Sequence, residues 1–242
     1  MLTTLTTKFR LNVCLLTLNS IRGRKWWPIP PDLRHIELPP EHERQLIALE
    51  PTPDWHGVRP RKFTKQRHDI MGPEVVNNQL IHRQYGIIAL TGYHITINHI
   101  NLIRTVINKH MDINKAFAIW RIEAPWKPIS KRSQGKRMGG GKAAIHHYAT
   151  PIRAGQVIVE IGGRIEFDEC YYYLESISKR LPCDAYPVSQ EILDHWDKEE
   201  EELKQKNINP ISFERVVKLN LQGSHQWIKP YDKLWYGKYT SG

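Results

Sequence analysis

Apolar positions in the middle of the chain follow strand and helix spacing in turn. Residues 86–90 form a short apolar run, which predicts a buried strand. Thr96 is a suitable helix N-cap, and an apolar stripe follows it at helical spacing: Ile97, Ile100, Ile103, Ile107 and Met111. Residues 116–123 alternate, which predicts a strand with one apolar side. We therefore expect the folded part of the chain to begin near Leu80.

The pattern continues in the second half. Residues 144–150 predict a strand, residues 151–155 a turn, and residues 156–161 a further strand that ends at two glycines. Residues 166–181 predict a helix, stopped by Pro182, with an apolar face made of Phe167, Cys170, Leu174 and Ile177. Strands and helices do not alternate strictly, which favours an α+β fold. The expected architecture is a two-layer sandwich of short mixed strands and two helices, with a long basic Gly-rich loop and extended N- and C-terminal segments.

Both flanks differ from this middle block. Residues 26–60 contain eight prolines, so residues 31–58 are predicted to be an extended segment that serves as a linker or lies along a partner. Residues 188–242 form a C-terminal extension, with a charged, acidic helix over 194–206 and an aromatic tail over 227–239. So many aromatic residues are expected to pack, on this domain or on another chain.

Charge is concentrated in the middle block. The chain carries 35 basic and 25 acidic residues, and residues 55–183 account for 20 of the basic and 9 of the acidic ones. A localised basic surface is typical of proteins that bind nucleic acid and, less often, an anionic membrane. No apolar run approaches the about 18 residues of a membrane span.

The N-terminus has its own composition. The first 31 residues contain no Asp or Glu and five basic residues, with many Thr and Leu. This composition predicts a mitochondrial transit peptide over residues 1–30 and a location in the mitochondrial matrix. The alternative is a secretory signal, because residues 11–18 form a short apolar run.

Residues 127–142, KPISKRSQGKRMGGGK, hold six basic residues, four glycines and no acidic residue. We expect nothing in this loop to fill a core, so its order must come from outside, and its charge and bare glycine backbone suit a dense field of phosphates. The alternative is a solvated, mobile basic loop.

No enzymatic motif is found in the sequence. A P-loop has four residues between its first glycine and its Gly-Lys pair, and Ser or Thr follows that pair. In this chain Ala143 follows Lys142 instead. The three cysteines show no metal-ligand spacing, and no nucleophile stands near a base. We therefore expect no catalytic residues, no metal and no cofactor.

Several of these stretches together resemble a known family. They are Trp120-Arg-Ile, Lys127-Pro-Ile-Ser, Lys136-Arg-Met-Gly-Gly-Gly-Lys142, Ala154-Gly-Gln-Val-Ile-Val-Glu-Ile-Gly-Gly163 and the basic run from Pro60. In this order they resemble the ribosomal protein L-sixteen family of the large subunit over residues 59–187, and the N-terminus suggests a mitochondrial member. The family commonly reads Arg-Met-Gly-Lys-Gly-Lys-Gly, so Gly140 and Ala143 depart from its pattern.

The resemblance implies a structural protein that binds large-subunit mitochondrial rRNA through residues 59–187, near the central protuberance and the acceptor end of A-site tRNA. Arg137 would make a bidentate contact, Lys136 and Lys142 would act as phosphate point charges, and Met138 would wedge against a base or sugar. The full expected rRNA-binding set is Arg59, Arg61, Lys62, Lys65, Arg67, Lys127, Lys131, Arg132, Lys136, Arg137, Met138, Gly139, Gly140, Gly141 and Lys142.

Other interpretations remain. The C-terminal extension, residues 188–242, is expected to meet neighbouring mitochondrial ribosomal proteins. An RNA-binding assembly factor that is not retained in the mature subunit would carry the same basic loop, and an enzyme acting on an anionic substrate would add a deep pocket with a perturbed titratable group.

Overall fold

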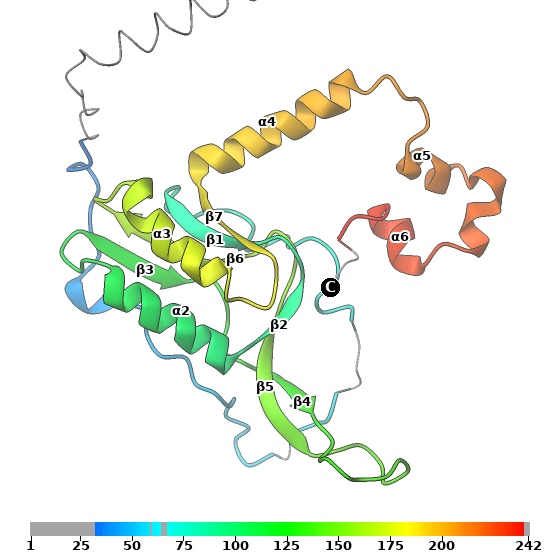
Figure 1. Ribbon diagram of the computed structural model, residues 1–242, viewed down its shortest axis with the longest axis horizontal. Helices are drawn as coiled ribbons and strands as arrows, with labels where there is room; N and C mark the ends of the chain where they lie inside the picture. The colour runs from blue at the N-terminus through cyan, green and yellow to red at the C-terminus, as the bar shows by residue number, and fades with distance from the viewer. Residues whose placement is uncertain (1–31, 59, 64–66, 240–242) are drawn as a thin grey trace, which may run out of the picture. The chain divides into compact units, whose positions relative to one another are not determined.

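The computed structural model describes residues 32–58, 60–63 and 67–239. The chain divides into two units, Met1–His35 and Ile36–Gly242, and the described helices and strands all belong to the second (Figure 1). The predicted transit peptide lies outside the described residues.

The larger sheet has four antiparallel strands in the order β3-β6-β1-β7. These strands are β1 (Tyr85–Ala89), β3 (Ala116–Trp120), β6 (Val157–Gly163) and β7 (Ala185–Ser189). β6 is buried along its whole length, as expected of an inner strand covered on both faces.

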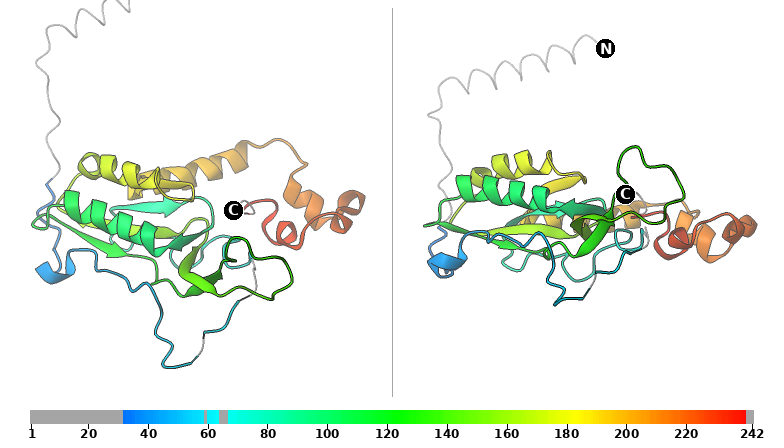
Figure 2. Two further views of the ribbon diagram at one scale, coloured as in Figure 1. Left: turned by 60° about the horizontal axis from the view of Figure 1, so that its bottom comes forward. Right: turned by 90° about the horizontal axis from the view of Figure 1, so that it is seen from below.

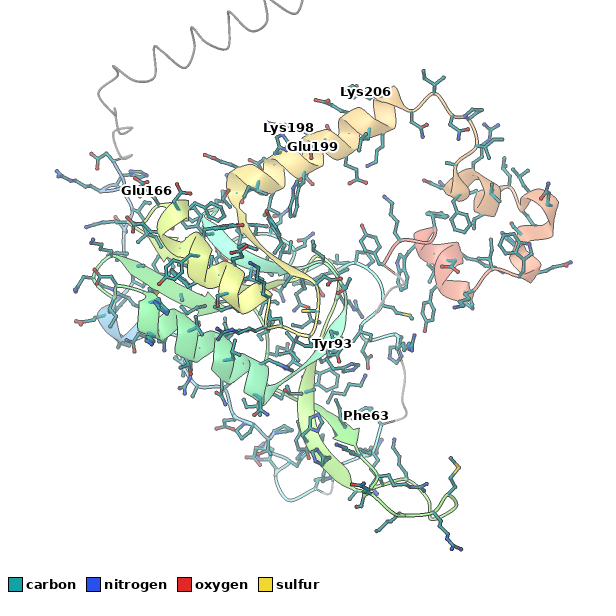
Figure 3. The ribbon with its side chains drawn as sticks, viewed as in Figure 1. Phe63, Tyr93, Glu166, Lys198, Glu199 and Lys206 are labelled. Carbon is teal, nitrogen blue, oxygen red and sulfur yellow. The ribbon has the colours of Figure 1, made fainter. Side chains whose placement is uncertain are left out.

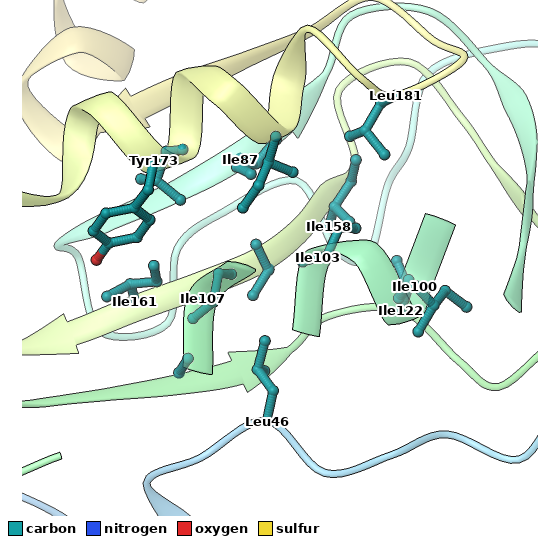
Figure 4. Close-up of a cluster of buried hydrophobic side chains, with 14 of the residues drawn as sticks. Leu46, Ile87, Ile100, Ile103, Ile107, Ile122, Ile158, Ile161, Tyr173 and Leu181 are labelled. Carbon is teal, nitrogen blue, oxygen red and sulfur yellow. The ribbon is translucent and has the colours of Figure 1, made fainter. Parts of the chain in front are cut away.

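Two helices cover one face of this sheet (Figures 1 and 2). They are α2 (Ile97–His110) and α3 (Phe167–Ser178). Thr96 caps α2 together with His99 in a capping box, and the predicted stripe of α2 is buried at Ile100, Ile103 and Ile107. These side chains join Ile87, Ile158, Ile161 and Tyr173 in one core (Figure 4). The α+β two-layer prediction is therefore confirmed, whereas the pairs of named strands are all antiparallel rather than mixed.

The opposite face of the sheet is covered by residues 77–84. Leu80 is buried there, and the fully buried carboxylate of Glu160 on β6 accepts hydrogen bonds from the backbone N–H groups of Ile81 (3.1 Å) and His82 (2.5 Å). The backbone N–H of Val157 donates to the carbonyl of Asn77 at 2.9 Å. The buried acid thus replaces strand pairing for a segment that has no regular structure.

The folded part begins well before Leu80, contrary to our expectation. Leu46 lies in the core, and its backbone N–H and carbonyl bond the side-chain amide of Asn108 on α2 at 3.2 and 3.1 Å. The indole N–H of Trp120 donates to the carbonyl of Ile47 at 2.8 Å. These residues follow a short 3-10 turn, η1 (Glu41–Glu43). The part of the proline-rich segment around Leu46 therefore packs on its own domain.

A second, three-stranded antiparallel sheet has the order β2-β5-β4. Its strands are β2 (Tyr93–Thr96), β4 (Lys127–Ser130) and β5 (Ile145–Ile152). The predicted turn at residues 151–155 is wrong at its start, because β5 continues through Pro151 and Ile152. β4 pairs with β5 only as far as Ala149, so the edge of β5 that faces β4 is unpaired at Pro151. An unpaired strand edge tolerates proline, which has no N–H to donate.

The C-terminal extension is helical. It contains α4 (Gln190–Lys206), α5 (Phe213–Lys218), η2 (Leu221–Gln226) and α6 (Pro230–Trp235). The side chain of Ser189 caps α4, which has no buried residue. The predicted charged helix is confirmed and begins at Gln190 rather than 194.

Part of the aromatic tail returns to its own domain. The ring of Trp235 packs against Gly72 so closely that a Cβ there would lie 2.5 Å from it, and Lys238 pairs with Glu200 on α4 at 3.1 Å. Trp227, in contrast, is exposed.

Candidate nucleic-acid interface

The basic glycine-rich segment joins β4 to β5 and projects beyond both sheets (Figures 1 and 2). We call residues 131–144 the finger. Every residue from 131 to 142 is exposed, and the side chain of Met138 is 95% exposed. Gly139 (φ +108°) and Gly141 (φ +76°) adopt backbone conformations that L side chains rarely adopt, whereas Gly140 does not. The glycines at 139 and 141 are thus required by the backbone path.

The cations of the finger are not neutralised by the protein. Within residues 32–58, 60–63 and 67–239, the side chains of Lys131, Arg132, Lys136, Arg137 and Lys142 form no ion pair with a carboxylate. One guanidinium N–H of Arg132 donates to the carbonyl of Gly141 at 3.3 Å, which leaves its charge in place. Such a surface attracts polyanions strongly, because its field is not cancelled locally.

The second basic segment meets the finger through Lys62. The ammonium of Lys62 donates to the carbonyl of Lys142 at 3.2 Å, across 80 residues of sequence. Arg61, Lys62 and Arg67 are exposed. The structure therefore joins two separate basic stretches into one surface, while Arg59 and Lys65 lie outside the described residues.

Lys127 is a correction to the expected rRNA-binding set. It is 6% exposed, and its ammonium pairs with the carboxylate of Asp69, which His68 also contacts at 2.7 Å. Pro128 is buried as well, so the first residues of the basic stretch are strand rather than loop. Lys127 therefore holds the domain together and presents no free charge to a phosphate.

Sequence reasoning missed Asp69 as the partner of Lys127. One signal was present, since Asp69 is the sole acidic residue between Asp54 and Glu74 in an otherwise basic stretch. The guanidinium of Arg153 also donates to the carbonyl of Asp69 at 3.3 Å. The segment that carries the second set of cations is thus anchored at its end to β4 and to the turn after β5.

His147, at the root of the finger, adds little charge. Burial, the neighbouring His146 and the nearby Lys131 lower the pKa of His147 below its ordinary value. The imidazole of His147 is therefore neutral at neutral pH, and the positive field comes from the lysines and arginines.

The two cysteines that the structure describes, Cys170 and Cys183, are buried. Burial raises the pKa of the Cys170 thiol to about 12 and that of Cys183 to about 11, so neither is a nucleophile at neutral pH. The part of the chain that the structure describes contains no group of three or more His, Cys, Asp or Glu that could hold a metal ion. No described helix is long and apolar enough to span a membrane.

An α+β fold with an exposed surface of unpaired cations is typical of the class of proteins that bind nucleic acid. The sequence pattern of the family "Ribosomal protein L16p/L10e" matches residues 58–188. The chain belongs to this family of ribosomal proteins, whose role is structural and not enzymatic. The predicted family is therefore confirmed.

Two curated relatives that match this chain share one description, large ribosomal subunit protein uL16. The large ribosomal subunit protein uL16 of Agathobacter rectalis is 30% identical over 140 residues, which span 57% of this chain and 94% of the relative. The large ribosomal subunit protein uL16 of Borrelia turicatae is 29% identical over 109 residues, covering 44% of this chain and 78% of the relative. These matches support a structural role in the large ribosomal subunit, and they leave a large part of this chain without a counterpart.

Proposed function

We propose that this chain is a structural constituent of the large subunit of the mitochondrial ribosome. Its finger and the segment 60–67 bind large-subunit rRNA, near the central protuberance and the acceptor end of A-site tRNA. The protein stays in the mature subunit in the mitochondrial matrix and supports translation.

One observation carries the rRNA proposal. Residues 131–142 of the finger are exposed, and the cations of the finger have no carboxylate partner among the described residues. Ordering such a segment costs about 1–2 kcal/mol per residue in backbone entropy, which only an external partner offsets. Phosphates are the partner that its charge selects.

The mitochondrial part of the proposal rests on the sequence. The first 31 residues lack acidic groups, and the matches to the two bacterial relatives cover 57% and 44% of the chain. Residues 188–242 lie almost wholly outside the family match and keep Trp227, Leu234 and Ile211 exposed. We propose that this extension meets neighbouring mitochondrial ribosomal proteins.

A charge-matched pair of triple variants tests the rRNA role. Lys136→Ala, Arg137→Ala and Lys142→Ala together should leave the thermal midpoint unchanged and lower the log–log salt slope of rRNA binding by about 2–3, since each phosphate contact adds about 0.7–0.9. The control replaces Lys198, Lys204 and Lys206 with alanine, which removes the same charge from helix α4. Figure 3 labels Lys198 and Lys206 on this helix, away from the finger.

Equal changes in slope for the two triple variants would show that net charge, and not the finger, governs binding.

Sedimentation of mitochondrial extracts tests whether the protein is retained in the mature subunit. A structural constituent remains with the large subunit through a high-salt wash, whereas an assembly factor dissociates or is confined to immature particles. Fusion of residues 1–31 to a reporter tests import, and a reporter left in the cytosol would contradict the location.

A further inference from the structure

Two aromatic side chains meet in the open at the root of the finger. The rings of Phe63 and Trp126 contact edge to face, with centroids 6.3 Å apart and planes at 78°. They remain 45% and 37% exposed, and Figure 3 shows Phe63 beside the β4–β5 hairpin. An edge-to-face contact leaves most of both ring faces uncovered by the partner ring, so aromatic surface stays available.

The pair lies where the basic elements converge. Trp126 directly precedes β4, the strand that leads into the finger. Phe63 follows Lys62, whose ammonium holds the carbonyl of Lys142 at the end of the finger. Arg61 and Lys62 are exposed on the same short segment. A nucleic-acid strand that contacts these cations therefore passes within reach of both rings.

The other side of Trp126 has the opposite charge. Trp126 lines a cleft of about 330 Å³ whose other walls include Asp69, Glu74 and Glu123 with the cation Arg153. This volume is at the lower end of the about 300–1,000 Å³ typical of ligand pockets. The carboxylates of Glu74 and Glu123 in this cleft repel phosphate, so a bound nucleotide would lie with its phosphate toward Lys62 and its base against the two rings.

We infer that Phe63 and Trp126 form a stacking platform for one unpaired rRNA base, an inference that rests on the proposed rRNA-binding function. Aromatic rings beside cations are the usual means of holding single-stranded RNA, because every base offers a π face. The cationic surroundings favour RNA over a protein partner, whose interface core is depleted in charged residues. The platform adds affinity that is independent of phosphate neutralisation.

Two short oligomers of equal length and charge test the platform: oligoadenylate and an abasic ribose-phosphate chain. Trp126→Ala should weaken oligoadenylate binding by about 5- to 150-fold, the range for loss of one stacked base, and leave abasic binding unchanged. Trp126→Phe should retain most of the affinity. Trp227→Ala, which removes an exposed tryptophan from the C-terminal extension, should change neither.

Four results would overturn the inference. The first two are a Trp126→Ala variant that leaves both affinities unchanged and one that lowers both equally; in either case the salt dependence of the wild-type chain still tests the finger separately. A photoreactive phenylalanine at position 63 that crosslinks to a neighbouring protein in the assembled subunit, instead of to rRNA, would assign the rings to a protein interface. Failure of the wild-type chain to bind rRNA at all would remove the proposed function and the platform together.

Discussion

The ion pair between Lys127 and Asp69 yields the sharpest prediction, because it decides between two roles for one lysine. The sequence suggests a phosphate contact, and the structure shows a buried anchor for the segment before residue 73. Lys127→Met keeps the side-chain volume and removes the charge. The carboxylate of Asp69 then loses its principal partner while its side chain is only 22% exposed.

Removing one partner of a buried ion pair costs about 3–5 kcal/mol. The retained contact from His68 and the partial hydration of Asp69 reduce this, so we expect Lys127→Met to lower the free energy of unfolding by about 2–3 kcal/mol. Asp69→Leu should cost about 3–5 kcal/mol, because the ammonium of Lys127 is less exposed than the carboxylate. The double variant should be close to the wild type, since neither charge is then left alone.

Urea unfolding at constant pH and salt measures all four proteins, with Lys131→Met as the matched control. Lys131 lies on the exposed finger, so its replacement should change stability by less than about 0.5 kcal/mol. The rRNA salt slope should stay at the wild-type value for Lys127→Met and fall by about 0.7–0.9 for Lys131→Met. A stable Lys127→Met protein with a reduced slope would refute the anchor and restore the phosphate contact.

Three further outcomes follow from the structure. Gly140→Lys should fold normally, because the site is open and its φ is not positive, and it should raise the rRNA salt slope by about 0.7–0.9. Gly141→Lys, at φ +76°, is the strained control and should have a lower thermal midpoint. Equal thermal midpoints for the two variants would contradict the difference in backbone strain. Burial and the charge of Lys127 lower the pKa of His94 from 6.5, so His94 takes up a proton on unfolding and the free energy of unfolding should fall as pH drops below 6.5. His94→Gln should flatten that pH dependence in urea titrations. An unchanged pH profile would argue against a role for His94. Glu160→Ala should cost about 2–4 kcal/mol in urea unfolding, because the backbone N–H groups of Ile81 and His82 lose their acceptor. A loss below about 1 kcal/mol would be inconsistent with that role.

Regular elements with strong periodicity were predictable. The stripe of α2, the apolar face of α3 and strands β1, β3 and β6 all follow from spacing that the chain carries locally. The strands β2, β4 and β7 were missed, because each contains polar residues or proline and shows no apolar run or alternation of its own. Their pairing with distant partners, and not their local pattern, makes them strands.

The candidate interface was predictable in composition but not in geometry. The exposed finger and its unpaired cations agree with the charge pattern of residues 131–142. The contact of Lys62 with Lys142 and the pairing of Phe63 with Trp126 join residues more than sixty positions apart, which no local pattern encodes. The rRNA contacts themselves remain a prediction.

The sequence by itself determined the family, the α+β class and the concentration of positive charge in the middle block, because each depends on short sequence patterns and on composition. Only the tertiary structure decided which lysines are free. Lys127 and Lys131 are alike in sequence, but a residue's access to an outside phosphate depends on burial and on the nearest carboxylate, and folding alone fixes both.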